Sequence, residues 1–322
     1  APAWASPRIS RRVTANTDPG GGAGASLPAL EPVCELDTAD VAEALQLSAT
    51  AHWNQTADDW RTMLALGRGW GLRARAADGT RPLVASTVVL PYDGGFAWIS
   101  MVLVQPAFRG QGLATRLLRL ALAHLAERGL TPILDATPAG HPVYARQGFA
   151  DTWGFARYRR AAAVPAPAPA LPKGMRLRHW QAADAPAVAA FDRPVFGADR
   201  LALLQQLAQR RPASAWLAED EGGRLCGYVC ARDGRDADQV GPLVADDPAV
   251  GLALLDAALA ALPGSVYVDL CDRHRSVLPR LQALGFEFQR PFTRMVLGPP
   301  GQPMPAPGDP ARLMLVAGPE LG

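Results

Sequence analysis

Hydrophobic residues follow two different periods along the chain, and their alternation predicts a mixed α/β architecture. The segments 82–90 and 96–104 are rich in β-branched and aromatic residues and are bounded by Asp-Gly or Gly-Gly turns, which predicts antiparallel strands. In the segment 113–125 apolar residues recur every three to four positions instead, as on one face of an amphipathic helix. After a short strand at 33–36, these periods give the element order ααβββαβαβ up to residue 160.

Capping residues and turns set the boundaries of the elements in this first half. Thr56 and Asp59 have the spacing of a capping box, and Gly129 is placed to end the long helix. Because that helix joins the strand 96–104 to the next strand, the two strands should run parallel. The predicted strands are 33–36, 70–76, 82–90, 96–104, 131–137 and a closing segment to about 159, and the predicted helices are 39–47, 56–66, 113 to about 128, and 142–147.

The second half of the chain repeats the rhythm of the first. The motif Tyr-x-x-x-Gly-Phe at 144–149 returns as Leu-x-x-x-Gly-Phe at 281–286. Such an internal repeat predicts a second copy of the same fold. Near the end of the chain, 311–316 could add one edge strand. The other predicted strands are 175–179, 215–218, 225–231, 240–244 and 265–270, and the predicted helices are 183–191, 199–209 and 248–262.

The repeats and the stretches between them define the predicted domains, since 322 residues are enough for two. A first domain spans 31–160 and a degenerate second domain spans 174–298. Both are of α/β (α+β) class, with a mixed, mostly antiparallel sheet flanked by helices. Residues 1–30 lack a compact apolar pattern and predict a flexible tail, although a basic leader could also be a transit sequence. Residues 161–173 predict an extended Pro/Ala linker, and 299–322 a C-terminal extension.

Composition narrows the classes of function. The chain is 49% hydrophobic and 19% charged with a net charge of +2, which fits globular domains and gives no electrostatic reason to expect nucleic acid. Lys173 is the only lysine, so Schiff-base chemistry and a P-loop lysine are excluded almost everywhere. The four cysteines show no C-x-x-C spacing, so we expect no metal site and a reducing, cytoplasmic compartment. No apolar run is long enough to span a membrane.

The most distinctive motif is the Gly-rich loop Arg109-Gly110-Gln111-Gly112, which joins a predicted strand to the long helix. Backbone amides at a helix N-terminus attract anions, and the helix end adds about half a positive charge to that of Arg109. A phosphate group is the ligand that suits this arrangement best. The alternative is that the glycines serve only the tight turn.

The pattern Arg-x-x-Gly-x-Ala at 109–114, followed by Tyr-x-x-x-Gly-Phe at 144–149, resembles the GNAT N-acetyltransferase superfamily. The resemblance covers 31–160 and implies acetyl-CoA as the co-substrate. It implies that the pyrophosphate is held by Arg109, Gly110, Gln111, Gly112, Leu113, Ala114 and Thr115. It also implies that the pantetheine arm lies between the fourth and fifth strands, which splay apart, against the backbone groups of Val102, Leu103 and Val104.

The reaction that this resemblance implies is direct attack of a substrate amine on the thioester carbonyl. Tyr144 stands at the family's position for the acid that protonates the thiolate, or it could merely pack against the pantetheine. Asp135 lies close to where many family members have Asn, and could accept a proton through water, bind a cationic substrate or cap the following turn. His52 is a second candidate for the base because of its intrinsic pKa, and His124 and His141 have weaker cases.

The connection between the first two helices is a candidate substrate-binding lip. An aromatic ring beside amides is suited to binding substrate, so we expect His52, Trp53 and Asn54 to contact it. The alternative is that Trp53 packs the two helices together while the amides cap them.

The second copy lacks this chemistry. Asp246-Asp247-Pro248 replaces the Gly-rich loop, and two carboxylates would repel a pyrophosphate while the proline removes a donor. Leu281 replaces Tyr144 and cannot donate a proton. The tandem arrangement resembles the YitH-like group of GNAT proteins, in which the second domain could wall the substrate cleft or order a homodimer.

We therefore expect an acetyl-CoA-dependent N-acetyltransferase that moves an acetyl group to a primary amine of a small molecule or a protein. Two alternatives stay open, an acyl-CoA hydrolase or decarboxylase on the same fold and a non-catalytic CoA-binding sensor or scaffold. We expect neither a nucleic acid nor a membrane as a partner.

Overall fold

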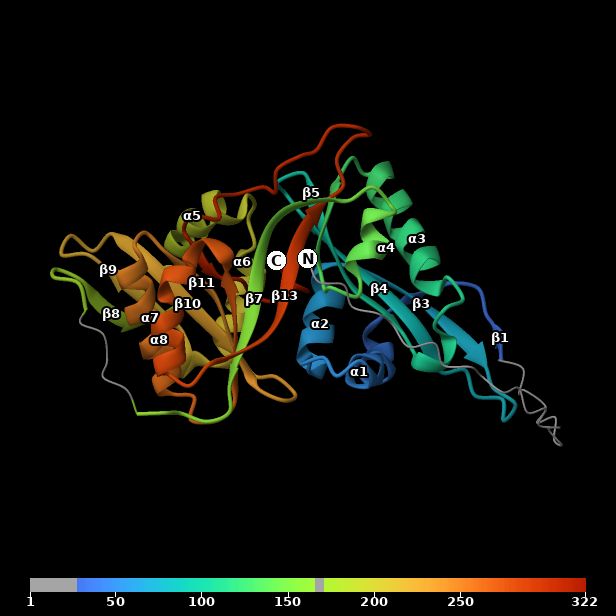
Figure 1. The fold of residues 1–322 in the computed structure, drawn as a ribbon, viewed down its shortest axis with the longest axis horizontal. Helices are drawn as coiled ribbons and strands as arrows, with labels where there is room; N and C mark the ends of the chain where they lie inside the picture. Colours follow the sequence, from blue (N-terminus) through green and yellow to red (C-terminus); the bar gives the residue numbers. More distant parts are fainter. Residues whose placement is uncertain (1–27, 166–170) are drawn as a thin grey trace, which may run out of the picture.

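The strands of both halves of the chain join into one continuous sheet in the computed structural model, which describes residues 28–165 and 171–322 (Figure 1). The predicted tail up to residue 27 and the middle of the predicted linker, 166–170, lie outside the described residues. Residues 29 and 30 of the predicted tail form β1 (Ala29–Leu30), which pairs with β3 (Arg68–Arg75).

The first half contains the predicted helices and strands, with boundaries shifted by a few residues. The capping box at the second helix is present, because the Thr56 backbone N–H donates to Asp59 Oδ2 at 2.8 Å. The remaining elements are β2 (Cys34–Leu36), α1 (Val41–Thr50), α2 (Ala57–Leu66), β4 (Leu83–Tyr92), β5 (Phe96–Val104), α3 (Leu113–Glu127), β6 (Thr131–Ala136), α4 (His141–Ala145) and β7 (Ala150–Arg160).

The second half repeats this order, as the sequence predicts. The seventh helix begins at Pro248, and its N-cap Asp247 accepts the backbone N–H of Ala249 at 2.7 Å. The elements are β8 (Arg176–His179), α5 (Ala185–Phe196), α6 (Leu201–Arg210), β9 (Trp216–Glu219), β10 (Leu225–Arg232), β11 (Asp238–Ala245), α7 (Pro248–Ala260), β12 (Val266–Cys271), α8 (Leu278–Ala283), β13 (Glu287–Val296) and β14 (Leu313–Leu315).

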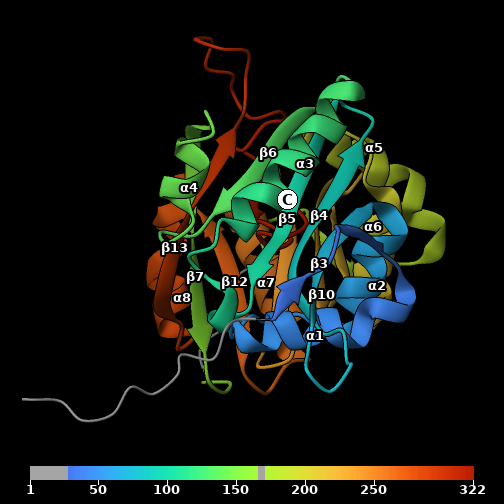
Figure 2. The same ribbon diagram turned by 90° about the vertical axis from the view of Figure 1, so that its right-hand side faces the viewer.

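Alternate residues of β4 pack on opposite faces of the sheet in the first half. Val88 and Leu90 pack with the buried residues of α1 and α2, whereas Val89 packs with those of α3. Figures 1 and 2 show α1 and α2 on one face of the sheet and α3 on the other. The strands on either side of α3, β5 and β6, run parallel, which confirms the prediction from their helical connection.

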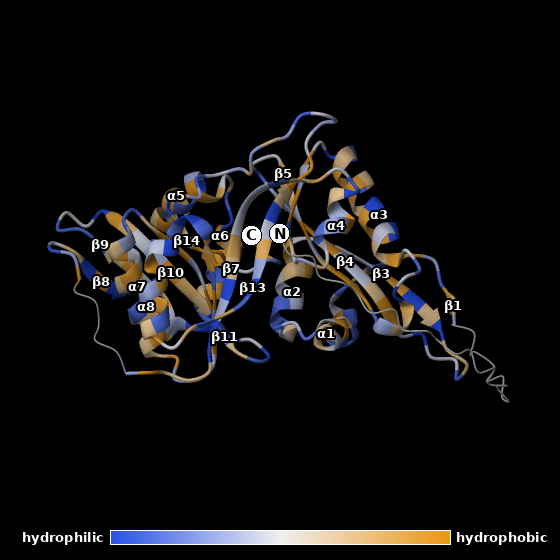
Figure 3. Ribbon diagram, in the orientation of Figure 1, coloured by the Kyte–Doolittle hydropathy of each residue, from blue (hydrophilic) through white to orange (hydrophobic). Residues whose placement is uncertain are grey.

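The two halves exchange their long final strands. β13, from the second half, lies between β6 and β7 of the first half, and β7 in turn pairs with β12. Main-chain hydrogen bonds therefore join the halves along the whole of β7, and neither half keeps an exposed sheet edge there. Figure 3 shows hydrophilic residues interrupting β7 and β13, whereas β4 and β10 are largely hydrophobic. The polar groups on the two exchanged strands lie where the halves meet.

The strand predicted at the edge of the sheet, 311–316, lies in its interior, so that prediction was wrong. β11 and β12 pair only from Asp238–Val266 to Val240–Val268 and then diverge. β14 fills the space that opens, and Leu315 pairs with both strands. The divergence leaves main-chain donors and acceptors without partners, and a third strand satisfies them.

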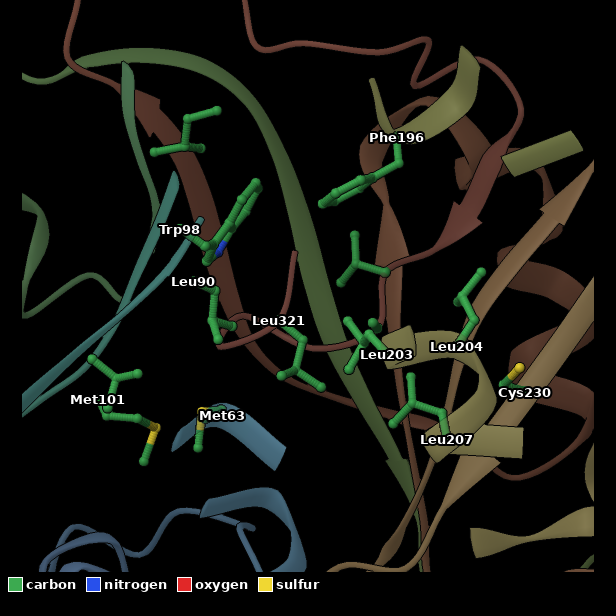
Figure 4. Close-up of a cluster of buried hydrophobic side chains, with 14 of the residues drawn as sticks. Met63, Leu90, Trp98, Met101, Phe196, Leu203, Leu204, Leu207, Cys230 and Leu321 are labelled. Atoms are coloured by element: carbon green, nitrogen blue, oxygen red, sulfur yellow. The ribbon is translucent and has the colours of Figure 1, made fainter. Parts of the chain in front are cut away.

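A hydrophobic cluster joins the two halves on the face of the sheet that α1 and α2 cover (Figure 4). It contains Met63, Trp98 and Met101 from the first half and Phe196 and Leu321 from the second, all buried. The rings of Trp98 and Phe196 stack with their centroids 6.1 Å apart. This shared core and the exchanged strands hold the end of the chain against β5.

Candidate active site

The Gly-rich loop presents its backbone to solvent at the start of α3. Gly110 and Gly112 have φ values of 78° and 74°, in the left-handed region that favours glycine, and a Cβ at either would meet no atom within 4 Å. The N–H groups in the first turn of α3 have no acceptor within the helix, because the helix begins at Leu113. Arg109 is exposed, and its Nε donates to the Val104 carbonyl at 3.2 Å. The loop can therefore bind an anion through several main-chain donors at once.

An open strand edge lies next to this loop. β5 pairs with β6 only as far as Trp98 and Ile133, so β5 has no strand partner on that side beyond Trp98 within the described chain. Met101, with φ at 50°, bends the strand at this point. Leu103 and Val104 still pair with β4 on the other side. This is the same divergence that β14 fills between β11 and β12, but here no strand of the described chain fills it.

A cavity opens where β5 and β6 diverge, and about 500 Å³ in and around it, including open solvent at its mouth, is not filled by protein atoms. Segments from both halves of the chain form its wall. These are Trp53 and Gln55 from the α1–α2 connection, Ile99, Ser100, Met101 and Val102 of β5, Leu134 and Asp135 of β6, Thr137 and Tyr144, Arg157 of β7, Arg290 and Phe292 of β13, and Pro319 and Glu320.

Tyr144 lies in this cavity, as expected for a group that acts on the thioester. Its ring meets that of Phe149 edge to face, with the centroids 6.1 Å apart. Among the described residues, nothing is hydrogen-bonded to its hydroxyl. Burial raises the pKa of Tyr144 to about 12, so the phenol stays protonated at neutral pH and is available as a donor.

Asp135 also faces the cavity but is held by an arginine. Nε and Nη2 of Arg294 donate to its two carboxylate oxygens, each at 2.9 Å. The guanidinium lies 4.3 Å from the ring centroid of Trp98 and 4.1 Å from that of Trp153. Burial raises the pKa of the Asp135 carboxyl, and the Arg294 guanidinium opposes that rise. The carboxylate thus ties β6 to β13 and does not cap the turn after β6.

The three residues expected to bind substrate have different environments. Trp53 lines the cavity. His52 is exposed, has φ at 55°, and does not line it. Asn54 is buried and binds the second half instead: its Nδ2 donates to the Ala237 carbonyl at 2.9 Å, and its Oδ1 accepts the Asp236 N–H at 2.9 Å. Its amide is therefore used in joining the halves.

The other two histidines considered lie away from the cavity. His141 Nε2 is 2.7 Å from an oxygen of Asp151, and the His124 ring meets that of Trp70 edge to face at 5.1 Å. Neither lines the cavity.

Gln55, the second amide of the expected substrate-binding connection, also lines the cavity. Sequence reasoning missed Arg157, Arg290 and Glu320 of the cavity wall. These three reach the cavity only through the strand exchange and the path of the chain after β14, and no local pattern marks them.

The corresponding place in the second half is closed. β14 occupies the gap between β11 and β12. At the start of α7, Asp246 binds Arg224 and Arg312 at 2.9 and 2.7 Å, and Asp247 caps the helix. The Asp247 carboxylate thus already accepts a main-chain donor at the start of α7, and Asp246 adds a second negative charge beside it.

Neither a membrane-spanning helix nor a metal-binding cluster is found among the described residues. No helix within 28–165 or 171–322 is both long and apolar enough to cross a bilayer. Within the same ranges, no three His, Cys, Asp or Glu side chains are grouped so as to hold a metal ion.

Known proteins resemble the chain along most of its length. Residues 39–149 match the Acetyltransferase (GNAT) family and residues 188–306 match an Acetyltransferase (GNAT) domain. A mycothiol acetyltransferase of Thermobispora bispora is 30% identical over 72% of this chain and 94% of its own length. A holothin acyltransferase of a Pseudoalteromonas species is 27% identical over 74% of this chain and 78% of its own.

Solved structures share the whole architecture. A putative acetyltransferase from Pyrococcus horikoshii has a TM-score of 0.70 at 18% identity and covers 94% of this chain and 99% of its own. A tandem GNAT protein from the clavulanic acid biosynthesis pathway has a TM-score of 0.60 at 19% identity, covering 84% and 99%. The protein therefore belongs to the GNAT acetyltransferase family, with two GNAT domains in tandem.

Proposed function

We infer that this GNAT acyltransferase moves an acetyl group from acetyl-CoA to a primary amine, and that only the first half does so. The observation that supports this inference most directly is the position of the cavity. It lies where β5 and β6 diverge, next to the loop at the start of α3, and contains a protonated tyrosine.

The residues that would hold acetyl-CoA are those of the loop and the open strand edge. The main-chain donors from Arg109 to Thr115 suit its pyrophosphate. The backbone of Val102 to Val104 suits the amides of its pantetheine arm, by the same strand-edge pairing that β14 provides in the second half. The second half offers neither, because β14 and two carboxylates occupy the corresponding places.

The chemical step needs a donor for the departing thiolate. The amine nitrogen forms a bond to the thioester carbonyl carbon and loses one proton to solvent, the carbon–sulfur bond breaks, and its electron pair goes to sulfur. Tyr144 donates its phenol proton to that sulfur and regains a proton from solvent. The phenol carries its proton at neutral pH when the thiolate forms, and burial, which raises its pKa, holds that proton more tightly.

The reaction class also draws support from the two curated relatives, which are named an acetyltransferase and an acyltransferase. Their names do not agree on the acceptor, so we adopt neither acceptor for this chain. We assign acetyl as the transferred group and a primary amine as the acceptor.

Thiol release from acetyl-CoA tests the function, measured with and without a panel of amines. Amine-dependent release with a matching amount of N-acetyl product is the expected result. Release at the same rate without any amine would indicate a hydrolase, and binding of acetyl-CoA without release would indicate a sensor. Either outcome would contradict the proposal.

A further inference from the structure

We propose that the acceptor is an amino acid or an amino-acid-like compound, with its amine at Glu320 and its carboxylate at Arg290. This inference rests on the proposed function and names its substrate class. Three polar side chains of the cavity wall have unused hydrogen-bonding atoms, and their charges match a zwitterion.

Glu320 provides the first of these atoms. The side chain is only 2% exposed and lies in the cavity wall. Its Oε1 accepts from Arg232 at 2.5 Å, whereas Oε2 is buried without a hydrogen-bond partner in the described parts of the chain. Arg232 also binds Asp59 at 3.0 Å, so its single positive charge is shared between two carboxylates. A buried carboxylate oxygen without a donor is costly, and an amine N–H would supply the donor.

The backbone around Glu320 is fixed on both sides. Trp98 Nε1 donates to the Pro319 carbonyl at 3.1 Å, and the Tyr92 hydroxyl donates to the Leu321 carbonyl at 3.0 Å. Leu321 is buried in the cluster that joins the halves. The carboxylate is therefore held in place before any substrate binds, which lowers the entropic cost of binding.

Gln55 provides a second acceptor. It is 5% exposed and lines the same cavity, and its Oε1 is buried without a partner among the described residues. An amine or ammonium group carries two or three N–H donors, so it can donate to more than one acceptor. Two unused acceptors in one cavity favour a nitrogen donor over a hydroxyl, which has only one hydrogen to give.

Arg290 provides the positive group. Of the two arginines that line the cavity, Arg157 is paired with Asp269 at 2.7 Å. The side chain of Arg290 makes no ion pair or hydrogen bond in the described chain, and its guanidinium lies 5.2 Å from the ring centroid of Phe292. Burial and the charge of Arg157 lower the pKa of Arg290, and the more distant carboxylates of Asp269 and Glu320 only partly oppose that effect.

A carboxylate is the ligand that fits such a guanidinium. The planar fork of an arginine binds the two oxygens of a carboxylate through parallel hydrogen bonds. The wall also contains large apolar side chains, among them Trp53, Ile99 and Phe292. We therefore expect acceptors with an apolar side chain.

Glu320 also has a chemical role in this arrangement. An amino acid carries an ammonium group at neutral pH, which must lose a proton before it can attack. Glu320 Oε2 accepts that proton and passes it to solvent. The free amine attacks the carbonyl carbon, its nitrogen loses a second proton, and Tyr144 protonates the sulfur. In sum, an ammonium ion and an acetyl thioester give an amide, a thiol and one proton.

Matched pairs of acceptors test the proposal. Each pair is an amino acid and the amine that remains after loss of its carboxyl group, for example leucine with 3-methylbutylamine and phenylalanine with phenethylamine. We expect kcat/KM to be about 10- to 100-fold higher for the amino acid, since a bond between charged groups is lost with the carboxylate. In Arg290→Met the two members of each pair should react at similar rates, whereas the surface variant Arg61→Met should keep the preference.

The variant Glu320→Gln tests the second contact. It keeps the shape and the bond to Arg232 but removes the base, so kcat/KM should fall about 100-fold or more. The activity that remains should rise more steeply with pH than that of the wild type, because it depends on the acceptor losing its ammonium proton to solvent. Affinity for acetyl-CoA should stay unchanged. A merely structural Glu320 would lower the melting temperature and leave the pH profile as it is, and that result would overturn its role.

The results separate this inference from the proposed function. Transfer to simple amines as fast as to amino acids would overturn the acceptor assignment while the acetyltransferase activity stands. Binding of acetyl-CoA without transfer to any pair would also overturn it. A wild-type protein that does not bind acetyl-CoA would overturn the proposed function itself.

Discussion

Asp135 and Arg294 form a bidentate ion pair between β6 and β13, with both nitrogen–oxygen distances at 2.9 Å and both side chains almost fully buried. The two residues are also directly opposite in the strand register. One residue comes from each half of the chain, so the pair fixes the exchanged strand at the wall of the cavity.

Removing one member of this pair should destabilise the fold. Asp135→Asn leaves Arg294 buried without an opposite charge, and we expect a loss of about 3–5 kcal/mol in the free energy of unfolding. The double variant Asp135→Leu, Arg294→Met should lose less unfolding free energy than the single variants Asp135→Leu and Arg294→Met lose together. Urea denaturation measures all of these. Additive effects would show that the pair is not coupled.

Tyr144→Phe should separate chemistry from binding. We expect kcat to fall about 100-fold or more, because the donor to the thiolate is lost. The melting temperature and the affinity for acetyl-CoA should hardly change, since the described chain gives the hydroxyl no hydrogen-bond partner. Steady-state kinetics and a thermal-shift assay with acetyl-CoA measure the two effects. An unchanged kcat would exclude the acid role.

The raised pKa of Tyr144 also predicts a pH dependence. The folded state keeps the phenol protonated up to a pKa of about 12, whereas the unfolded chain releases the proton near the ordinary value of about 10. The stability that this residue contributes is therefore fully present below pH 10 and is lost as the pH rises toward 12. The difference in unfolding free energy between wild type and Tyr144→Phe should shift in favour of the variant over that range, as measured by denaturation at a series of pH values.

Two glycines offer a matched test of the loop. Gly112 and Gly79 have similar left-handed φ values of 74° and 82°, and a Cβ added at either position would meet no atom within 4 Å. Alanine at either should cost about 1 kcal/mol in backbone strain. Only Gly112→Ala should weaken acetyl-CoA binding, because only Gly112 adjoins the main-chain donors of α3. Equal affinities in the two variants would argue against the loop as the pyrophosphate site.

Asn54 should matter for stability and not for the acceptor. Asn54→Ala leaves the main-chain groups of Asp236 and Ala237 without partners in a buried place, which should cost about 2–4 kcal/mol. Since the amide does not line the cavity, KM for the acceptor should stay near that of the wild type. A large rise in KM in a variant of nearly normal stability would restore Asn54 as a substrate contact.

The elements that a local pattern encodes could be predicted from the sequence. The capping box at Thr56, the helix after Gly112 and the parallel pair β5–β6 each depend on residues close together in the chain. The repeat of the fold in the second half was visible for the same reason. These local patterns were enough to predict the fold and the position of the Gly-rich loop before α3.

The parts of the fold and of the site that were not predicted depend on pairings between segments far apart in the chain. β14 was predicted as an edge strand because its short apolar run does not show that β11 and β12 diverge and leave room for it. Glu320 and Arg290 reach the cavity only after that strand and the exchanged strand β13 are in place. Asp135 was named from its place at a strand end, but the arginine that holds it is 159 residues further along the chain.

Calorimetry of acetyl-CoA binding tests the central claim most directly, with wild-type protein beside Arg109→Glu. Arg109 is exposed, so the variant should fold normally, and it places a carboxylate in the loop before α3, as Asp246 does in the loop before α7. We predict one acetyl-CoA per chain for the wild type and little or no binding for the variant. Two bound molecules per wild-type chain, or unchanged binding in Arg109→Glu, would contradict the assignment of the site to the first half.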